Sequence, residues 1–213
     1  MNLPRLLLAL ALVGPVALVS TRAAATTVAP LTVDQMTDAA DLVVRGVVLE
    51  TWTDLDEQGA VYTYARIRVT ASLKGYADPA DELVVETPGG VYDGVVAPVH
   101  AAARYSVDEE AVLFLAEKRF GTSYGTVAMA RGKYTVKMNP ADGQPMVVSF
   151  TRPWNESFDA RFVPTPPAAD RLSLAAFEAQ VLARVERGWD GRPIPGISAT
   201  KLRSINKLQP GVR

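Results

Sequence analysis

The sequence predicts a mainly β protein: a small antiparallel OB-like barrel with a short N-terminal helix and a C-terminal helix packed outside it. Two observations carry this prediction. About seven short segments rich in β-branched residues lie between residues 42 and 150, with turn signals between them. No helical pattern separates these segments, although a parallel α/β sheet would need a helix between successive strands.

The N-terminal helix is expected over residues 32–40. Thr32 and Gln35 have the spacing of a capping box, in which the hydroxyl and the amide each satisfy a free backbone N–H. Leu31 and Met36 stand where a hydrophobic staple would form. The local pattern therefore defines the start of the helix.

The strands are expected in a domain that covers residues 26–150. Gly46 predicts a bulge or tight bend in the first of them. In the second strand, residues of different character alternate between the two faces. The segments 124–130 and 133–138 are expected to pair around Arg131-Gly132. Residues 88–105 are interpreted as a long connection with little regular structure. The predicted strands are 42–52, 62–73, 83–87, 111–116, 124–130, 133–138 and 146–150.

Three further segments follow the β domain. Residues 151–170 contain four prolines and are interpreted as an extended arm, pinned to the barrel by Trp154, Phe158 and Phe162. A C-terminal helix is expected within 171–188, capped by Ser173, with one apolar face for the barrel. That face consists of Leu174, Phe177, Val181, Leu182 and Val185. Residues 189–213 are expected to form a flexible basic tail.

Residues 1–25 have the pattern of a signal peptide. Arg5 precedes an apolar run over 6–19, and three alanines end at Ala25. The run is shorter than the roughly 20 residues that cross a bilayer. We therefore expect a periplasmic or secreted protein without a membrane span in its mature form.

Composition excludes several classes of function. The chain has no cysteine, which rules out thiol catalysis and cysteine-based metal sites. Residues 26–183 carry a net charge of −8 and residues 184–213 a net charge of +5. An acidic body without a nucleic-acid motif argues against DNA or RNA as a partner. The basic end is interpreted as solvated, with an anionic partner as the alternative.

Three segments resemble the netrin-like module, the OB-type barrel of tissue inhibitors of metalloproteinases and of secreted bacterial proteins. They are the first-strand segment 40–48, the second-strand segment 67–75 that ends in the Lys74-Gly75 turn, and the segment 105–115 with its acidic turn and strand. The resemblance implies the fold and a binding role. The cysteines typical of that family are missing, including the one that engages zinc, so no functional residue is carried over.

No residue pattern predicts catalysis, and no metal or cofactor is expected. His100 is the only histidine, and its neighbours supply neither a nucleophile nor an orienting acid. The acidic run 54–59 lacks the ligand spacing of a calcium loop and is interpreted as a solvated turn. The sequence predicts no catalytic residue.

Two sets of residues are candidates for binding. The connection 88–105 carries Tyr92, Asp93 and Arg104, and long loops on a rigid scaffold often hold contact sites. The second set follows one face of a predicted strand, where aromatic and arginine side chains favour an interface and ordinary cross-strand pairing is the alternative. That set is Tyr62, Tyr64, Arg66 and Arg68.

These observations favour a non-catalytic binding or interaction module of the cell envelope, with an unknown protein or envelope component as partner. Two alternatives remain open at this point. One is a hydrolase that uses a pair of carboxylates. The other is a structural envelope component that associates through its C-terminal helix.

Overall fold

The computed structural model describes residues 31–118, 123–149, 157–158, 164–165 and 172–207. The predicted signal peptide, Trp154 and Phe162 lie outside these residues. In the described part, no helix is long and apolar enough to cross a membrane.

The chain is mainly β, with 44% of it in strands and 20% in helices, as the sequence predicts. The first half contains α1 (Val33–Ala39), β1 (Leu42–Leu55), β2 (Val61–Lys74), β3 (Glu82–Pro88), β4 (Gly90–Tyr92), β5 (Val95–Ala97) and β6 (Glu110–Glu117). The second half contains β7 (Tyr124–Thr126), the 3-10 helix η1 (Met129–Gly132), β8 (Lys133–Met138), β9 (Pro145–Ser149), β10 (Ser157–Phe158), β11 (Pro164–Thr165), β12 (Leu172–Ser173), α2 (Leu174–Arg187) and α3 (Ala199–Lys207).

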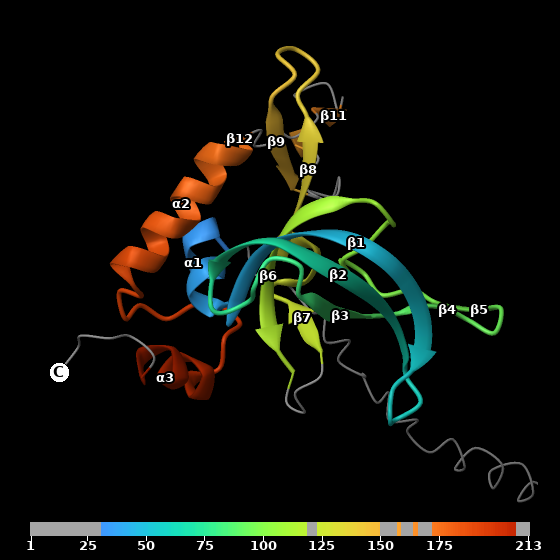
Figure 1. Ribbon diagram of the computed structural model, residues 1–213. Helices are drawn as coiled ribbons and strands as arrows, with labels where there is room; N and C mark the ends of the chain where they lie inside the picture. Colours follow the sequence, from blue (N-terminus) through green and yellow to red (C-terminus); the bar gives the residue numbers. More distant parts are fainter. Residues whose placement is uncertain (1–30, 119–122, 150–156, 159–163, 166–171, 208–213) are drawn as a thin grey trace, which may run out of the picture.

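The main sheet has the order β1-β2-β3-β7-β6-β8-β9-β12, and β1 also pairs with β6. This extra pairing closes β1, β2, β3, β7 and β6 into a ring of five strands. The helices gather on one side of the ring, and the β4–β5 hairpin projects on the opposite side (Figure 1). One side of the ring is therefore covered by helices, and the other carries the hairpin.

Apolar residues fill both the inside of the ring and the layer between the ring and the helices. Ile67, Val85 and Leu113 are fully buried inside the ring. Phe114 and Phe177 meet edge to face, with ring centroids 6.2 Å apart, and so join β6 to α2. The cysteine-free chain is thus held by packing in two adjoining clusters.

The sequence signals at the start of the domain are confirmed. The capping box of Thr32 and Gln35 is present, and β1 is irregular between Arg45 and Gly46, where a bulge is predicted. Lys74 donates hydrogen bonds from Nζ to the carbonyl oxygens of Thr37 (2.6 Å), Asp38 (3.2 Å) and Ala40 (2.7 Å). It thereby satisfies carbonyls at the end of α1. Burial lowers the pKa of its ammonium group.

The structure differs from the sequence prediction in one strand pairing and in part of one helix face. The segments 124–130 and 133–138 do not pair with each other, because β7 pairs with β3 and β6 while β8 pairs with β6 and β9. On α2, Ser173 caps the helix and Leu174, Phe177 and Val181 are buried, as predicted. Leu182 and Val185 remain exposed.

The segment after α2 is more ordered than the flexible tail that the sequence predicts. Ile194 is buried, and the partly buried Trp189, Ile197 and Leu202 pack on the same cluster. Residues 199–207 form α3. These apolar residues are scattered rather than periodic, so the sequence pattern underestimates their burial.

Candidate functional site

The first three strands extend beyond the ring on the side away from the helices. The pairing of β1 with β6 ends at Val47, whereas its pairing with β2 continues to Leu55. In this extension Thr53, Thr63 and Thr87 stand at the same register on β1, β2 and β3. They form a row of three threonines, which we call the threonine row.

Gly89 and Gly90 carry the chain back across the threonine row. A Cβ atom on Gly90 would lie 2.5 Å from Oγ1 of Thr63, and one on Gly89 would lie 2.5 Å from the carbonyl oxygen of Ala97. Both residues have positive φ values, +89° for Gly89 and +149° for Gly90. Only glycine fits such a crossing, which explains the Pro-Gly-Gly sequence before the hairpin.

The hairpin of β4 and β5 turns at Asp93-Gly94. Both residues have positive φ values, 46° and 75°, as the two central residues of a type I′ turn require. Val91 and Val96 lie opposite each other across the hairpin. A two-stranded hairpin of this length is marginally stable alone, so its contact with the threonine row helps to hold it.

A groove of about 440 Å³ lies between the threonine row and the hairpin. We call it the hairpin groove. Its walls are mostly apolar, and the threonine hydroxyls and Arg104 supply its polar groups. The lining comprises Thr53, Thr63, Thr87, Pro88, Gly89, Gly90, Val91, Val96, Ala97, Pro98, Val99, Ala102, Ala103, Arg104 and Tyr105.

One hydroxyl of the groove has no partner. Thr63 donates to the carbonyl oxygen of Gly89 at 2.7 Å. Thr87 is only 5% exposed, and its Oγ1 has no hydrogen-bond partner among the described residues. Buried polar atoms are nearly always paired. The accessible area of this oxygen is below 1 Å², so it lies within the wall of the groove and not at its open surface.

The hairpin also exposes apolar side chains to solvent. Val95 and Val96 are each 65% exposed, Val91 is 58% exposed and Val99 is 42% exposed. Single exposed apolar residues are ordinary, whereas a contiguous apolar patch marks an interaction site. The groove and the hairpin together have the composition of a binding site, mostly apolar with a few polar groups.

A second hollow, of about 250 Å³, adjoins the hairpin groove at Arg104. We call it the cationic hollow; it is lined by Arg104, Ser106, Glu109, Ala130, Lys133, Thr135 and Lys137. Its centre is an ion pair between the buried Lys133 and the partly buried Glu109, with Nζ and Oε2 2.6 Å apart. Lys133 also donates to the carbonyl oxygen of Arg104.

The partners of Glu109 fix its ionised form. Burial raises the pKa of the carboxyl, but hydrogen bonds from Lys133, Thr135 and the backbone of Ser106 outweigh burial and lower it overall. A general acid needs the opposite shift. This carboxylate therefore positions Lys133 rather than supplying a proton.

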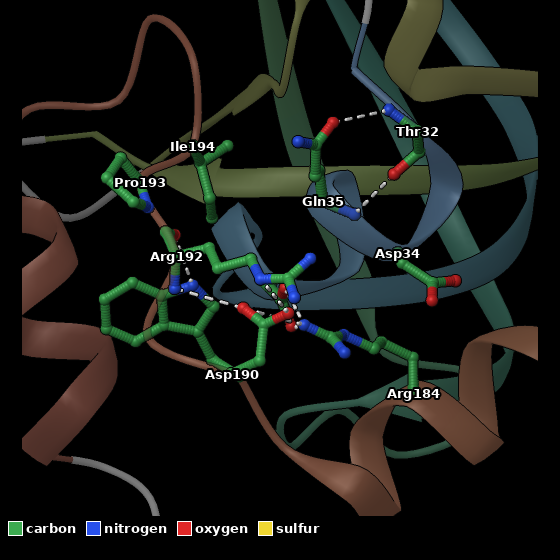
Figure 2. A pocket seen from close by; sticks show the side chains of 10 residues that line it. Thr32, Asp34, Gln35, Arg184, Asp190, Arg192, Pro193 and Ile194 are labelled. Atoms are coloured by element: carbon green, nitrogen blue, oxygen red, sulfur yellow. Dashed lines mark hydrogen bonds and ion pairs between the residues drawn. The ribbon is translucent and has the colours of Figure 1, made fainter.

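The third hollow, about 200 Å³, lies between α1 and the segment after α2 and is strongly polar (Figure 2). Arg184 binds Asp38 through two hydrogen bonds of 2.9 and 2.6 Å; Asp38 is buried and Arg184 is largely buried. Asp34 lies 3.3 Å from Arg187. Carboxylates paired with arginine in this way are typical of structural ion pairs, not of the acid pair of a glycoside hydrolase.

The predicted stripe on β2 lies on the face opposite the threonine row. Trp52 stacks on Tyr64 with ring centroids 5.4 Å apart. Arg66 pairs with Glu50 at 2.6 Å, and Arg68 lies 3.7 Å from Glu82. Each charged group of the stripe thus has a neighbour on an adjacent strand. This geometry is that of cross-strand pairing, the alternative that the sequence left open.

The structure separates the predicted binding residues into three places. Arg104 lines both the hairpin groove and the cationic hollow, Tyr92 and Asp93 lie at the hairpin tip, and the β2 stripe faces away. Sequence reasoning missed the threonine row, because its members come from three strands whose register the sequence does not reveal. The Asp93-Gly94 turn between valines was the one available signal for the hairpin.

Compared with protein-family models and with curated proteins, the chain finds no match. The interpretation of the site therefore depends on its geometry.

Proposed function

We propose that this chain is a non-catalytic binding protein of the cell envelope that holds an apolar ligand in the hairpin groove. The observation that carries the proposal is the mostly apolar groove of about 440 Å³, whose walls include the exposed side chains of Val91, Val96 and Val99. Val95, on the other face of the hairpin, is a further exposed apolar side chain.

Two sequence features support the wider setting. The leader pattern at 1–25 is typical of export, and residues 31–138 contain the three segments that resemble the netrin-like module. A closed ring of five strands is compatible with that module. We accordingly include export and a netrin-like fold in the proposal.

The neutral apolar dye N-phenyl-1-naphthylamine tests the groove, because its fluorescence rises in apolar surroundings. We expect saturable binding to the protein. Val96→Asp places a charge on the groove wall and should weaken dye binding by roughly tenfold or more, since burying an uncompensated charge is costly. The matched control is Leu182→Asp, at an exposed position of α2 on the helical side.

Circular dichroism shows whether each variant keeps its fold. Val96→Ser, a smaller change that adds no charge, provides a second measurement and should weaken dye binding by a few-fold. The proposal is wrong if the folded protein binds no dye, or if Leu182→Asp lowers the affinity as much as Val96→Asp does.

A further inference from the structure

The hairpin groove and the cationic hollow meet at one side chain. Arg104 lines both, and the short segment 102–106 runs between them. One side of Arg104 is thus apolar, with valines and alanines. The other side is polar and carries Lys133 and Lys137.

The charges of the hollow are not balanced internally. Glu109 neutralises Lys133, with Nζ and Oε2 2.6 Å apart. Arg104 and Lys137 are exposed, and neither has an ion-pair partner among the described residues. Two unpaired cations stand out on a domain whose net charge is −8 over residues 26–183. They create a local positive potential at one end of an apolar groove.

We propose that the ligand is a small anionic amphiphile, with an alkyl chain in the hairpin groove and a carboxylate or phosphate head held by Arg104 and Lys137. This inference rests on the proposed function and adds the charge of the ligand. A guanidinium group has a planar fork of donors that matches such a head. Lys133 is a positioning residue, because it holds the backbone carbonyl of Arg104 while its charge is taken by Glu109.

A small molecule fits these surfaces better than a bilayer does. Asp93 stands at the tip of the hairpin, where a bilayer would have to accept a charge. The backbone edges of β4 and β5 have no pairing partner among the described strands, and unpaired backbone groups are costly in hydrocarbon. A ligand that lies behind the hairpin avoids both costs.

Calorimetric titration with decanoate, decanol and decylammonium tests the charge of the head, with the two ions kept below their micellar concentrations and decanol below its solubility limit. We expect decanoate to bind roughly tenfold or more tightly than decanol, as hydrogen bonds to charged groups allow, and decylammonium to bind most weakly. Added salt should lower the affinity for decanoate and leave the affinity for decanol unchanged.

Arg104→Gln should lower the affinity for decanoate roughly tenfold while leaving decanol unaffected. Lys137→Gln should have a smaller effect in the same direction. The matched control is Arg192→Gln, which removes an exposed arginine beside the polar hollow near α1.

The outcomes separate this inference from the proposed function. Suppose that the dye binds and that Val96→Asp weakens dye binding, but that decanoate binds no more tightly than decanol. Then the proposed function is supported, and the proposal of an anionic head group is wrong. The same conclusion follows if Arg104→Gln and Arg192→Gln have equal effects. If neither the dye nor any of the three decyl compounds binds, both proposals fall.

Discussion

Thr87 is a residue whose unpaired, buried hydroxyl is expected to lower the stability of the fold. Its hydroxyl is buried without a hydrogen bond, so the folded state bears a desolvation cost that the unfolded state does not. Thr63, its neighbour on β2, shows the ordinary arrangement, because its hydroxyl donates to the backbone of Gly89. The difference between these two threonines can be measured.

Thr87→Val replaces the hydroxyl by a methyl group of similar shape. We expect the free energy of unfolding to stay the same or to rise by about 1 kcal/mol, since an unsatisfied polar group is removed. Thr63→Val, the matched control, removes a formed hydrogen bond and should lower it by about 1 kcal/mol. Urea unfolding measures both, and a clear loss of stability in Thr87→Val would contradict the argument.

At the scale of elements, a single carboxylate ties the segment before β6 to β8. Glu109 accepts hydrogen bonds from Lys133 and Thr135 of β8 and from the backbone of Ser106. Its folded pKa lies below the ordinary 4.5. The unfolded chain therefore binds more protons just below pH 4.5, and the stabilisation is present above that pH and is lost as the pH falls through the folded pKa.

Glu109→Gln should be less stable than the parent at pH 7, by about 1–3 kcal/mol, because Lys133 loses its counter-charge. The difference in unfolding free energy between the parent and the variant should shrink as the pH falls below 4.5. The parent carboxyl then becomes protonated and is uncharged, like the glutamine amide. Unfolding curves at several pH values test this expectation. Glu57→Gln, in the exposed turn between β1 and β2, is the control, and a difference that does not change with pH would refute it.

Elements encoded by local residues could be predicted, and elements encoded by distant contacts could not. The capping box at Thr32 and the bulge at Gly46 follow from nearby residues alone. For β7 the sequence predicts a strand at 124–130, but its shorter extent, Tyr124–Thr126, and its pairing with β3 and β6 depend on distant contacts. Ile194 is buried by contacts with distant elements rather than by a periodic pattern of its own.

The candidate site shows the same division. Arg104 could be selected from a loop that carries few signals, but the threonine row could not, since it depends on the register of three strands. Alternation in the sequence separates the two faces of β2, but only the closed ring shows which face borders the groove. One face carries the groove, and the other carries the stacked ring of Tyr64.

At the scale of the molecule, α1 and α2 of the helical layer are joined to each other by apolar packing and by a largely buried ion pair. Arg184 of α2 and Asp38 of α1 are far apart in the sequence and bind through two hydrogen bonds. The side chains are 11% and 6% exposed. Removing one partner leaves the other charge buried and unpaired.

Arg184→Met and Asp38→Asn should each lower the free energy of unfolding by about 3–5 kcal/mol, since each leaves an uncompensated or poorly matched buried group. The double variant should lose less than the sum of the two, because the second change removes the group that the first left unpaired. A double-mutant cycle by urea unfolding measures this coupling. The exposed pair of Arg187 and Asp34, 3.3 Å apart, is the matched control and should show coupling below about 1 kcal/mol. Strictly additive losses at Arg184 and Asp38 would show that this ion pair does not couple α1 to α2 and that apolar packing holds the two helices together.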